Sequence, residues 1–591
     1  MSDILSKKII FFLIAIQLLL IIFVFFQLKS NYPFFMYPPP GTDMLTRIKE
    51  ANSLLKGNFP GNSPYMHVFF YIYILAGIFI ISMRDIFLAR FIQSLSLLFI
   101  TYFTYRIAKM IFGKKTGLLA AILSILYFPY YAYSYFFIDT IIQTLLMIAS
   151  LFILLSIRNK PSMIKLFLAG LIVSSFILIR PNTLIMFPVF IYILFPKIEK
   201  KNIFNVLCFL FFSSFLIILP MIRNYAVSGH FKLIVGSSST LWIGNNEMAN
   251  GSMFFGDNRN AIREKVKKNG NGEYLKDIIN FATTKPRKFI FLQLKKLYLF
   301  FDSYEIPNNL NLFEIRKGSY ILKIIPLGFS LIGPLFFMGL FIYFYSEKHS
   351  TEATFLLWSL FLYIIAVCIF FVISRFRMPA IPLFIIFSAY ALENVYRFFK
   401  ENVNKRILII IVFIASYSLV NFSTISSFIM RFKPSKTIET VNGKLAIDDN
   451  NIWRSRKIVK LRKGIKAKKD IKITRKTPYL FLQICYIAKE AQNTFEVEIN
   501  DKKEILKNAN VKVLFEEGSN QYLVSFLSLP NELIKHGVNS FIIHGKKNIS
   551  LPYDDSVNLG RSAVIDTKNH FKNIDGEFMI RLLLSKTPAP E

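Results

Sequence analysis

The sequence contains few of the residues on which several classes of soluble protein depend. It has 3 cysteines and 6 histidines in 591 residues. Cys208 and Cys368 lie inside apolar runs, and only Cys485 lies in a polar region, so neither a disulfide framework nor a cysteine-based metal cluster is expected. No glycine-rich phosphate loop, zinc motif or Ser-His-Asp order stands out, and no nucleotide-binding domain is visible. These absences argue against a soluble nucleotide-dependent enzyme.

Acidic residues are also scarce, with 36 Asp and Glu against 71 Lys and Arg and a formal net charge of +35. In a soluble protein this excess would favour nucleic acid as the partner. No nucleic-acid-binding motif accompanies the charge. In a membrane protein, Lys and Arg flank the cytoplasmic ends of spans and lie near anionic headgroups. We therefore expect membrane lipids, and no nucleic acid, as partners.

Long hydrophobic runs dominate what is present. Hydrophobic residues make up 54% of the chain, 64 of them Phe, and the mean hydropathy is +0.45. The pattern predicts a polytopic α-helical membrane protein with about 11 to 13 transmembrane helices. The runs long enough to span a bilayer are 9–29, 88–112, 116–135, 138–156, 163–180, 182–196, 203–222, 322–345, 353–373, 378–397 and 405–425.

The positive charges predict the topology of a multi-pass protein of the cell membrane. The first apolar run is too long for a signal peptide and lacks a cleavage site, so we interpret it as a first span with a cytoplasmic N-terminus. Lys114–Lys115, Arg158–Lys160 and Lys197–Lys201 indicate cytoplasmic turns. The turns alternate correctly only if the apolar stretch 65–82 does not span. We therefore expect an interfacial or re-entrant helix there and an extracytoplasmic C-terminus.

This topology predicts two domains. Residues 1–429 form the transmembrane domain, with a first external loop at 30–87 and a second at 223–320. Residues 430–591 form a soluble extracytoplasmic domain, in which short alternating runs such as FEVEIND and NSFIIHG are separated by Gly, Asn and Asp. Alternation of this kind predicts a β-sandwich-like fold.

The first loop contains a helix signal that begins with an acid. Thr42 can cap a helix that runs to about Lys56, and Gly57 can end it. Asp43 opens this helix. An acid is favoured in the first turn of any helix, so Asp43 taken alone has an ordinary structural explanation. One apolar stripe follows from the helical spacing and contains Met44, Ile48, Ala51 and Leu55.

The order of the motifs resembles a known superfamily. The first loop reads D-x3-R-x3-A-x3-L-x-G from Asp43 to Gly57, and four further stretches follow: LARFIQSLSLLFITYFTYRIAKMIFGKKTGLLAA, FILIRPNTLIMFP, RNYAVSGHFKLIVGSSSTLWIGNNEMANG and SRFRMPAIPLFIIFSAYAL. Together they resemble the GT-C superfamily of membrane glycosyltransferases, in particular the protein O-mannosyltransferase-like family 39 and the related lipid A aminoarabinose transferases. One departure is that many relatives carry two adjacent acids, whereas Asp43 is followed by Met44.

The resemblance implies a glycosyltransferase that acts at the outer membrane face. It would move a single sugar from a polyprenyl phosphate, dolichyl or undecaprenyl, to a lipid, a cell-envelope glycan or a protein. The resemblance makes Asp43 the general base, and attack opposite the phosphate would invert the anomeric carbon. Asp139, at the start of a span, is the second acid and helps to organise the site. Asp43 and Asp139 could also hold a divalent metal, Mg or Mn. Helix-dipole capping remains the alternative for Asp139.

Cationic and polar residues complete the expected site. The resemblance assigns the donor phosphate to Arg375, Arg377, Arg180 and Arg223, since arginine suits phosphate contact, while snorkelling at the interface is the alternative. The candidates for substrate contact are His67, Asn182, Trp242, Asn245 and Asn246. His67 could equally be an ordinary interfacial residue, and Trp242 and the two asparagines could simply form a turn.

Two other classes of function stay open. A flippase or transporter of lipid-linked glycan would fit many spans, but duplicated halves and charges in the middle of the membrane are typical of transporters and are not seen here. A glycan polymerase or ligase would also need a large external loop. The sugar, the acceptor and the role of the soluble domain are not specified by the sequence.

Overall fold

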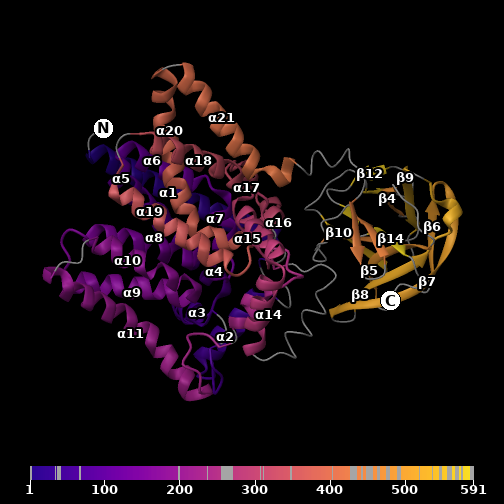
Figure 1. Cartoon of the computed structure of the whole chain (residues 1–591), viewed down its shortest axis with the longest axis horizontal. Helices are drawn as coiled ribbons and strands as arrows, with labels where there is room; N and C mark the ends of the chain where they lie inside the picture. The colour runs from indigo at the N-terminus through magenta and orange to yellow at the C-terminus, as the bar shows by residue number, and fades with distance from the viewer. Residues whose placement is uncertain are drawn as a thin grey trace. The chain divides into compact units, whose positions relative to one another are not determined.

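A computed structural model gives the fold. It describes residues 3–585 except 33–34, 36–41, 66–67, 197–199, 236, 254–270, 307, 310–311, 347–348, 402, 426–435, 441–442, 448–456, 462–465, 474–478, 489–493, 518–519, 536, 545–548, 555–561, 566–570, 574–576 and 579. The chain divides into two compact units, and the boundary between their main parts lies between Phe422 and Ser423. The first is helical and the second is built of strands (Figure 1).

The helical unit contains long apolar helices joined by short helices and turns. Its α-helices are α1 (Asp3–Asn31), α2 (Asp43–Leu55), α3 (Phe69–Ile81), α4 (Ile86–Ser94), α5 (Ser96–Phe112), α6 (Lys114–Ile125), α7 (Phe128–Ser134), α8 (Thr140–Ile157), α9 (Met163–Ile179), α10 (Phe187–Leu194), α11 (Ile203–Ser228), α12 (Ser237–Ile243), α14 (Asn271–Thr284), α15 (Pro286–Phe301), α16 (Leu312–Lys317), α17 (Tyr320–Ile324), α18 (Phe329–Tyr345), α19 (Thr351–Cys368), α20 (Ile381–Glu401) and α21 (Val403–Val420). Its 3-10 helices are η2 (Pro181–Met186), η3 (Lys200–Asn202) and η5 (Ser374–Ala380).

Among the described residues, 6 helical segments are long and apolar enough to cross a membrane. They are Ile4–Asn31, Ile86–Phe112, Thr140–Ile157, Ile203–Ser228, Thr351–Cys368 and Ser374–Phe399. Shorter apolar helices are Phe69–Ile81, Met163–Ile179, Pro181–Leu194 and Phe329–Tyr345. The predicted fold class, a polytopic helical membrane protein followed by a β-rich domain, is confirmed. The number of spans and their orientation stay predictions.

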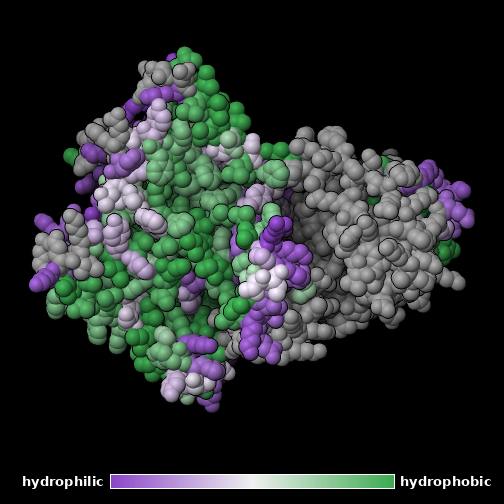
Figure 2. Space-filling view, in the orientation of Figure 1, coloured by the Kyte–Doolittle hydropathy of each residue, from purple (hydrophilic) through white to green (hydrophobic). Residues whose placement is uncertain are grey.

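The surface of the helical unit is apolar over a wide area. Figure 2 shows hydrophobic residues over most of its visible face, while hydrophilic residues gather over α14 and at the edges. Large apolar side chains point outward, among them Phe11, Phe211 and Phe291. A surface of this kind would aggregate in water and suits a hydrocarbon environment.

Two predicted segments differ in detail from the structure. The expected span at 116–135 is divided into α6 and the short α7, which carries Pro129 at its start. Proline cannot donate a backbone hydrogen bond in a helix interior, which explains the division. Thr42 occupies the N-cap position of α2, but its side chain makes no capping hydrogen bond. The helix ends as expected before Gly57, whose φ of 78° lies in the left-handed region that glycine adopts easily.

Helix α2 rests on α3 through its apolar stripe. Met44, Ile48 and Ala51 are buried, together with Arg47, and the two helices are in contact. Helix α3 is the segment for which a non-spanning helix was predicted, and its 13 residues are too few to cross about 30 Å of hydrocarbon unless the bilayer thins around the helix. This packing fixes the position of Asp43 at the N-terminus of α2.

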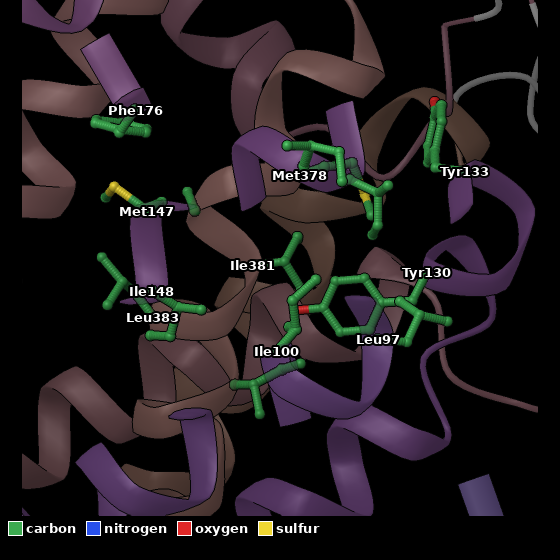
Figure 3. Packing of buried hydrophobic residues seen from close by; sticks show 14 of the residues in the cluster. Leu97, Ile100, Tyr130, Tyr133, Met147, Ile148, Phe176, Met378, Ile381 and Leu383 are labelled. Atoms are coloured by element: carbon green, nitrogen blue, oxygen red, sulfur yellow. The ribbon is translucent and has the colours of Figure 1, made fainter. Parts of the chain in front are cut away.

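The core of the unit lies where the middle helices meet η5 and α20. Figure 3 shows residues of this buried cluster, which come from α5, α7, α8 and α9 and include Met378 of η5 and Ile381 and Leu383 of α20. Helix α8 contacts η5 directly. The start of α8 and the arginines of η5 are therefore held against one another by the buried core.

In the described residues of the second unit, 14 strands are linked by pairing into one continuous sheet. The order of hydrogen-bonded neighbours is β1-β2-β14-β5-β8-β7-β6-β9-β4-β11-β12. Three further strands lie off this path, namely β10, β3 and β13. All pairs are antiparallel, and the long β7 pairs β8 with one part and β6 with another. Residues in β6 alternate between buried and half-buried, which gives this strand one core face.

The strands have the following bounds: β1 (Lys436–Thr440), β2 (Gly443–Ile447), β3 (Lys457–Leu461), β4 (Lys466–Ile473), β5 (Tyr479–Ala488), β6 (Thr494–Ile499), β7 (Lys502–Glu517), β8 (Asn520–Ser528), β9 (Gly537–His544), β10 (Ile549–Asp554), β11 (Ser562–Ile565), β12 (Phe571–Asn573), β13 (Glu577–Phe578) and β14 (Ile580–Ser585).

Candidate active site

Asp43 is joined to two residues that are far away in the sequence. Its Oδ2 lies 2.9 Å from Nη2 of Arg375, on η5. The amide of Asn309 donates to the same Oδ2 over 2.5 Å, and the backbone N–H of Asp43 donates to Oδ1 of Asn309 over 3.1 Å. The segments 30–87 and 223–320, which were predicted to be external loops, therefore meet η5 at this carboxylate.

The Asp43 carboxylate is accessible and ionised. Its side chain is 44% exposed, whereas that of Arg375 is 9% exposed. Burial raises the pKa of the Asp43 carboxyl, but the Arg375 guanidinium, helped by Arg47 and Asn309, outweighs burial and holds that pKa below its ordinary value. Asp43 can accept a proton at neutral pH because it is almost completely deprotonated there.

Arg375 keeps donors that no described residue uses. Its Nε and Nη1 atoms are buried and have no hydrogen-bond partner within the described part of the chain. A buried guanidinium with unpaired N–H groups is costly, and an anion with several oxygens would satisfy it in the bidentate manner that arginine favours. Arg375 is therefore the arginine of this site best prepared to receive a phosphate.

Asp139 and Arg180 form a second acid–arginine pair. Nε of Arg180 lies 2.6 Å from Oδ2 of Asp139, and their side chains are 16% and 5% exposed. Asp139 stands at the N-cap of α8 without a capping hydrogen bond from its side chain, so its carboxylate is engaged by Arg180 instead. The positive charges of Arg375 and Arg47 also act on this carboxylate.

The ring of Phe376 connects the two pairs. The guanidinium carbon of Arg180 lies 4.0 Å from the centre of this ring, and that of Arg375 lies 5.4 Å from it. Guanidinium groups are attracted to aromatic faces, so the ring holds both arginines in one neighbourhood. The structure thus brings together four of the predicted residues: Asp43, Asp139, Arg180 and Arg375.

Arg377 differs from Arg375, although only one residue separates them. Its guanidinium donates to the carbonyl oxygens of Phe300 and Asp302 and forms a buried ion pair of 2.8 Å with Glu305. It also lies 3.7 Å from the ring centre of Phe329. Arg377 therefore fastens the end of α15 to η5, and its assignment to the donor phosphate stays a prediction without a contact to the Asp43 cluster.

Arg223 and Asn182 also contact the backbone. Arg223, near the end of α11, donates to the carbonyl oxygens of Gly61 and Ser63. Asn182 donates to the carbonyl oxygen of Ala366 over 2.7 Å. These contacts anchor the first loop and the end of α19, and neither residue touches the Asp43 cluster through them.

Of the remaining substrate-contact candidates, Trp242 lies in the last turn of α12, and Asn245 and Asn246 lie in the turn that follows this helix. Trp242 is buried beside Tyr274. Asn245 donates to the carbonyl oxygens of Leu241 and Ile369, and Asn246 donates to that of Trp242. These contacts fit the simple-turn alternative for the two asparagines, and the assignment of all three residues to substrate contact stays a prediction. His67 lies outside the described residues.

Sequence reasoning assigned no role to two residues of the cluster. Arg47 is buried on α2 one turn after Asp43, where it pairs with Glu50 at 2.6 Å and adds positive charge beside both acids. Asn309 has a φ of 53°, and asparagine tolerates this left-handed region better than most residues. Arg47 lies four residues after Asp43, so helical spacing could have indicated that the two side chains are neighbours. Nothing in the sequence linked Asn309 to Asp43.

The described residues do not fit a resident divalent ion. They contain no group of three or more His, Cys, Asp or Glu side chains able to hold one. Asp43 and Asp139 are each paired with an arginine, and Arg47 adds further positive charge. A dication would be repelled by these guanidinium groups. We therefore derive no chemical step through a metal, and the predicted Mg or Mn stays a prediction.

A comparison with protein families bears on the segment that contains Asp139 and Arg180. Residues 66–222 match the family model described as dolichyl-phosphate-mannose-protein mannosyltransferase. The predicted resemblance to the GT-C superfamily is confirmed. The match covers α3 to most of α11. It contains neither Asp43 nor Arg375. No curated protein matches the chain.

Solved structures similar to the chain include archaeal enzymes. The archaeal oligosaccharyltransferase AglB from Archaeoglobus fulgidus, in complex with an inhibitory peptide and a dolichol-phosphate, has 15% identity and a TM-score of 0.36, over 72% of this chain and 58% of that one. Crystal structures of the Archaeoglobus fulgidus oligosaccharyltransferase, in the apo form and in complex with Zn and sulfate, each have 15% identity and a TM-score of 0.34. They cover 72% and 71% of this chain and 58% and 55% of theirs. The chain thus spans little more than half of their length.

Proposed function

We propose that the protein transfers a single sugar from a polyprenyl-phosphate donor to an acceptor at the outer face of the membrane, with Asp43 as the general base. The observation that carries this proposal is the pairing of Asp43 with Arg375. It places a half-exposed, ionised carboxylate beside a buried guanidinium whose Nε and Nη1 have no hydrogen-bond partner among the described residues. A base and a phosphate-binding group are the two requirements of such a transfer.

The chemistry follows from these two groups. A hydroxyl or amine of the acceptor attacks the anomeric carbon, and its proton passes to the Asp43 carboxylate. The bond between that carbon and the phosphate oxygen breaks, and Arg375 stabilises the negative charge that develops on the lipid phosphate. Attack from the face opposite the phosphate inverts the anomeric carbon.

The second acid–arginine pair supports this site. Asp139 and Arg180 are almost fully buried and hold the start of α8 next to η5. Their ion pair keeps Arg180 against the ring of Phe376, which also contacts Arg375. We assign Asp139 and Arg180 to organising the site and Arg375 to the direct phosphate contact.

The family comparison favours a lipid-linked donor over a nucleotide sugar. The matching family model is described by a dolichyl-phosphate-linked mannose and a protein acceptor. Membrane helices supply an apolar environment for a polyprenyl tail. A lipid, a glycan and a protein all remain acceptors to be tested, and the C-terminal strand-rich domain is a candidate for recruiting one of them.

Purified protein in detergent tests the proposal. Polyprenyl-phosphate mannose is the first donor, followed by other polyprenyl-phosphate hexoses, with peptide, lipid and glycan acceptors offered separately. We expect release of polyprenyl phosphate and, by mass spectrometry, an acceptor heavier by one sugar. Many added sugars would indicate a polymerase or ligase. Movement of the lipid-linked sugar in vesicles, without transfer from any donor, would show a transporter and contradict the proposal.

A further inference from the structure

Asn309 and Arg375 bind the same oxygen of Asp43. The amide of Asn309 and Nη2 of Arg375 both donate to Oδ2. No described residue donates to Oδ1, although the side chain is 44% exposed. The two carboxylate oxygens, which are chemically alike in solution, therefore differ here, since Oδ2 accepts from two donors and Oδ1 accepts from none in the described part of the chain.

Asn309 holds Asp43 through the backbone as well as the side chain. Its Oδ1 accepts from the backbone N–H of Asp43 over 3.1 Å while its amide donates to the side chain. This orientation of the amide is the one that the partners require, because the backbone N–H of Asp43 can only donate and its ionised carboxylate can only accept. A contact on both parts of one residue restricts rotation of the Asp43 side chain.

We propose that Asn309 is a positioning residue for the transfer reaction, which holds Oδ2 of Asp43 so that Oδ1 takes the proton of the acceptor. This inference rests on the proposed function and adds to it the oxygen that reacts and the loop that orients it. The second external loop, 266 residues away from Asp43, is thereby a part of the active site.

The backbone of Asn309 allows a sharp test. Its φ of 53° would be strained in alanine, but glycine adopts this region freely. Asn309→Gly therefore removes the side chain with little backbone cost. Asn309→Asp keeps the shape, removes the amide donor and places a second negative charge beside Asp43. Asn500→Gly is a matched control, because Asn500 also has a left-handed φ, of 47°, and a hydrogen-bonded side chain, in β-rich surroundings.

The first measurement does not need turnover. Carbodiimide modifies protonated carboxyl groups, so labelling of Asp43 in the full-length protein, followed by peptide mass spectrometry against pH, reports its protonation. Loss of a donor to the carboxylate disfavours the charged form. We expect the labelling midpoint to rise in Asn309→Gly and to rise further in Asn309→Asp, and to stay in place in Asn500→Gly. Unchanged midpoints in both Asn309 variants would overturn the proposal.

The second measurement is steady-state transfer from the donor that the wild-type protein uses. We expect kcat to fall about tenfold or more in Asn309→Gly, which corresponds to the loss of one hydrogen bond to a charged group, while KM for the donor changes less than about threefold. A lower thermal stability with an unshifted Asp43 midpoint would mean a structural role only. If Asp43→Asn retains full transfer while the midpoints still shift, Asn309 orients Asp43 but the proposed base is wrong.

Discussion

The two acid–arginine pairs of the helical unit have the same chemistry and opposite exposure. The Asp43 side chain is 44% exposed beside Arg375, and the Asp139 side chain is 5% exposed beside Arg180. Asp43 begins the 13-residue helix α2, whereas Asp139 is the N-cap of α8, which is long enough to span the membrane. The difference in exposure fits the two proposed roles, in which the accessible carboxylate takes the proton and the buried one organises the site.

The partners of the two acids sharpen this comparison. Arg375 has buried N–H groups without a partner among the described residues, so the pair with Asp43 can accept a third, anionic member. Arg180 instead combines its ion pair with a close contact to Phe376. We therefore expect substitutions at the first pair to change catalysis and substitutions at the second to change stability.

Replacing Arg375 by alanine is expected to have the largest effect on the handling of the donor. Loss of the phosphate-stabilising group should lower kcat/KM by about 100-fold or more, and Arg375→Lys should restore it only in part, because lysine lacks the planar fork of arginine. The variant also removes the main positive charge that lowers the pKa of Asp43.

The pH dependence of transfer by Arg375→Ala separates the loss of phosphate stabilisation from the change in the pKa of Asp43. A raised pKa means that Asp43 becomes protonated at a higher pH, so the acid limb of kcat should move upward from below about pH 4, the ordinary range of Asp. Arg223→Ala is the control, since Arg223 contacts Gly61 and Ser63 rather than Asp43. An acid limb that stays in place would show that Asp43 is not the titrating group.

Replacing Asp139 by asparagine is expected to act mainly on stability. It leaves Arg180 with an uncompensated charge in a nearly buried position, which typically costs about 3 to 5 kcal/mol. The thermal transition in detergent should fall by several degrees, while donor affinity per folded molecule should stay within about threefold. Full stability combined with lost transfer would instead place Asp139 among the reacting groups.

Much of the helical architecture could be predicted from local patterns. Long apolar runs predicted the spanning helices, and the alternation in FEVEIND predicted the strand observed as β6. The spacing from Asp43 to Gly57 predicted α2 nearly to the residue. These features follow from periodicity and helix-end signals, which act over a few residues. The number of spans, which depends on topology, is not fixed by such signals.

The site itself was only partly predictable, because tertiary contacts decide it. Arg375 and Arg377 look equivalent in the motif SRFRMP, yet a buried ion pair with Glu305 distinguishes Arg377. Asn309 lies in an ordinary loop sequence and meets Asp43 only after the chain has folded. Residue type and spacing identified the candidate acids and arginines. They contain no information on which arginine N–H groups are occupied by other residues once the chain has folded.

The most direct test of the account is single-turnover transfer by Asp43→Asn in the purified protein, with polyprenyl-phosphate donor binding measured on the same samples. The substitution keeps the shape of the side chain and removes its ability to accept the proton. We predict a dissociation constant for the donor within about threefold of wild type and a transfer rate at least about 100-fold lower. Transfer at the wild-type rate would contradict the assignment of Asp43 as the base.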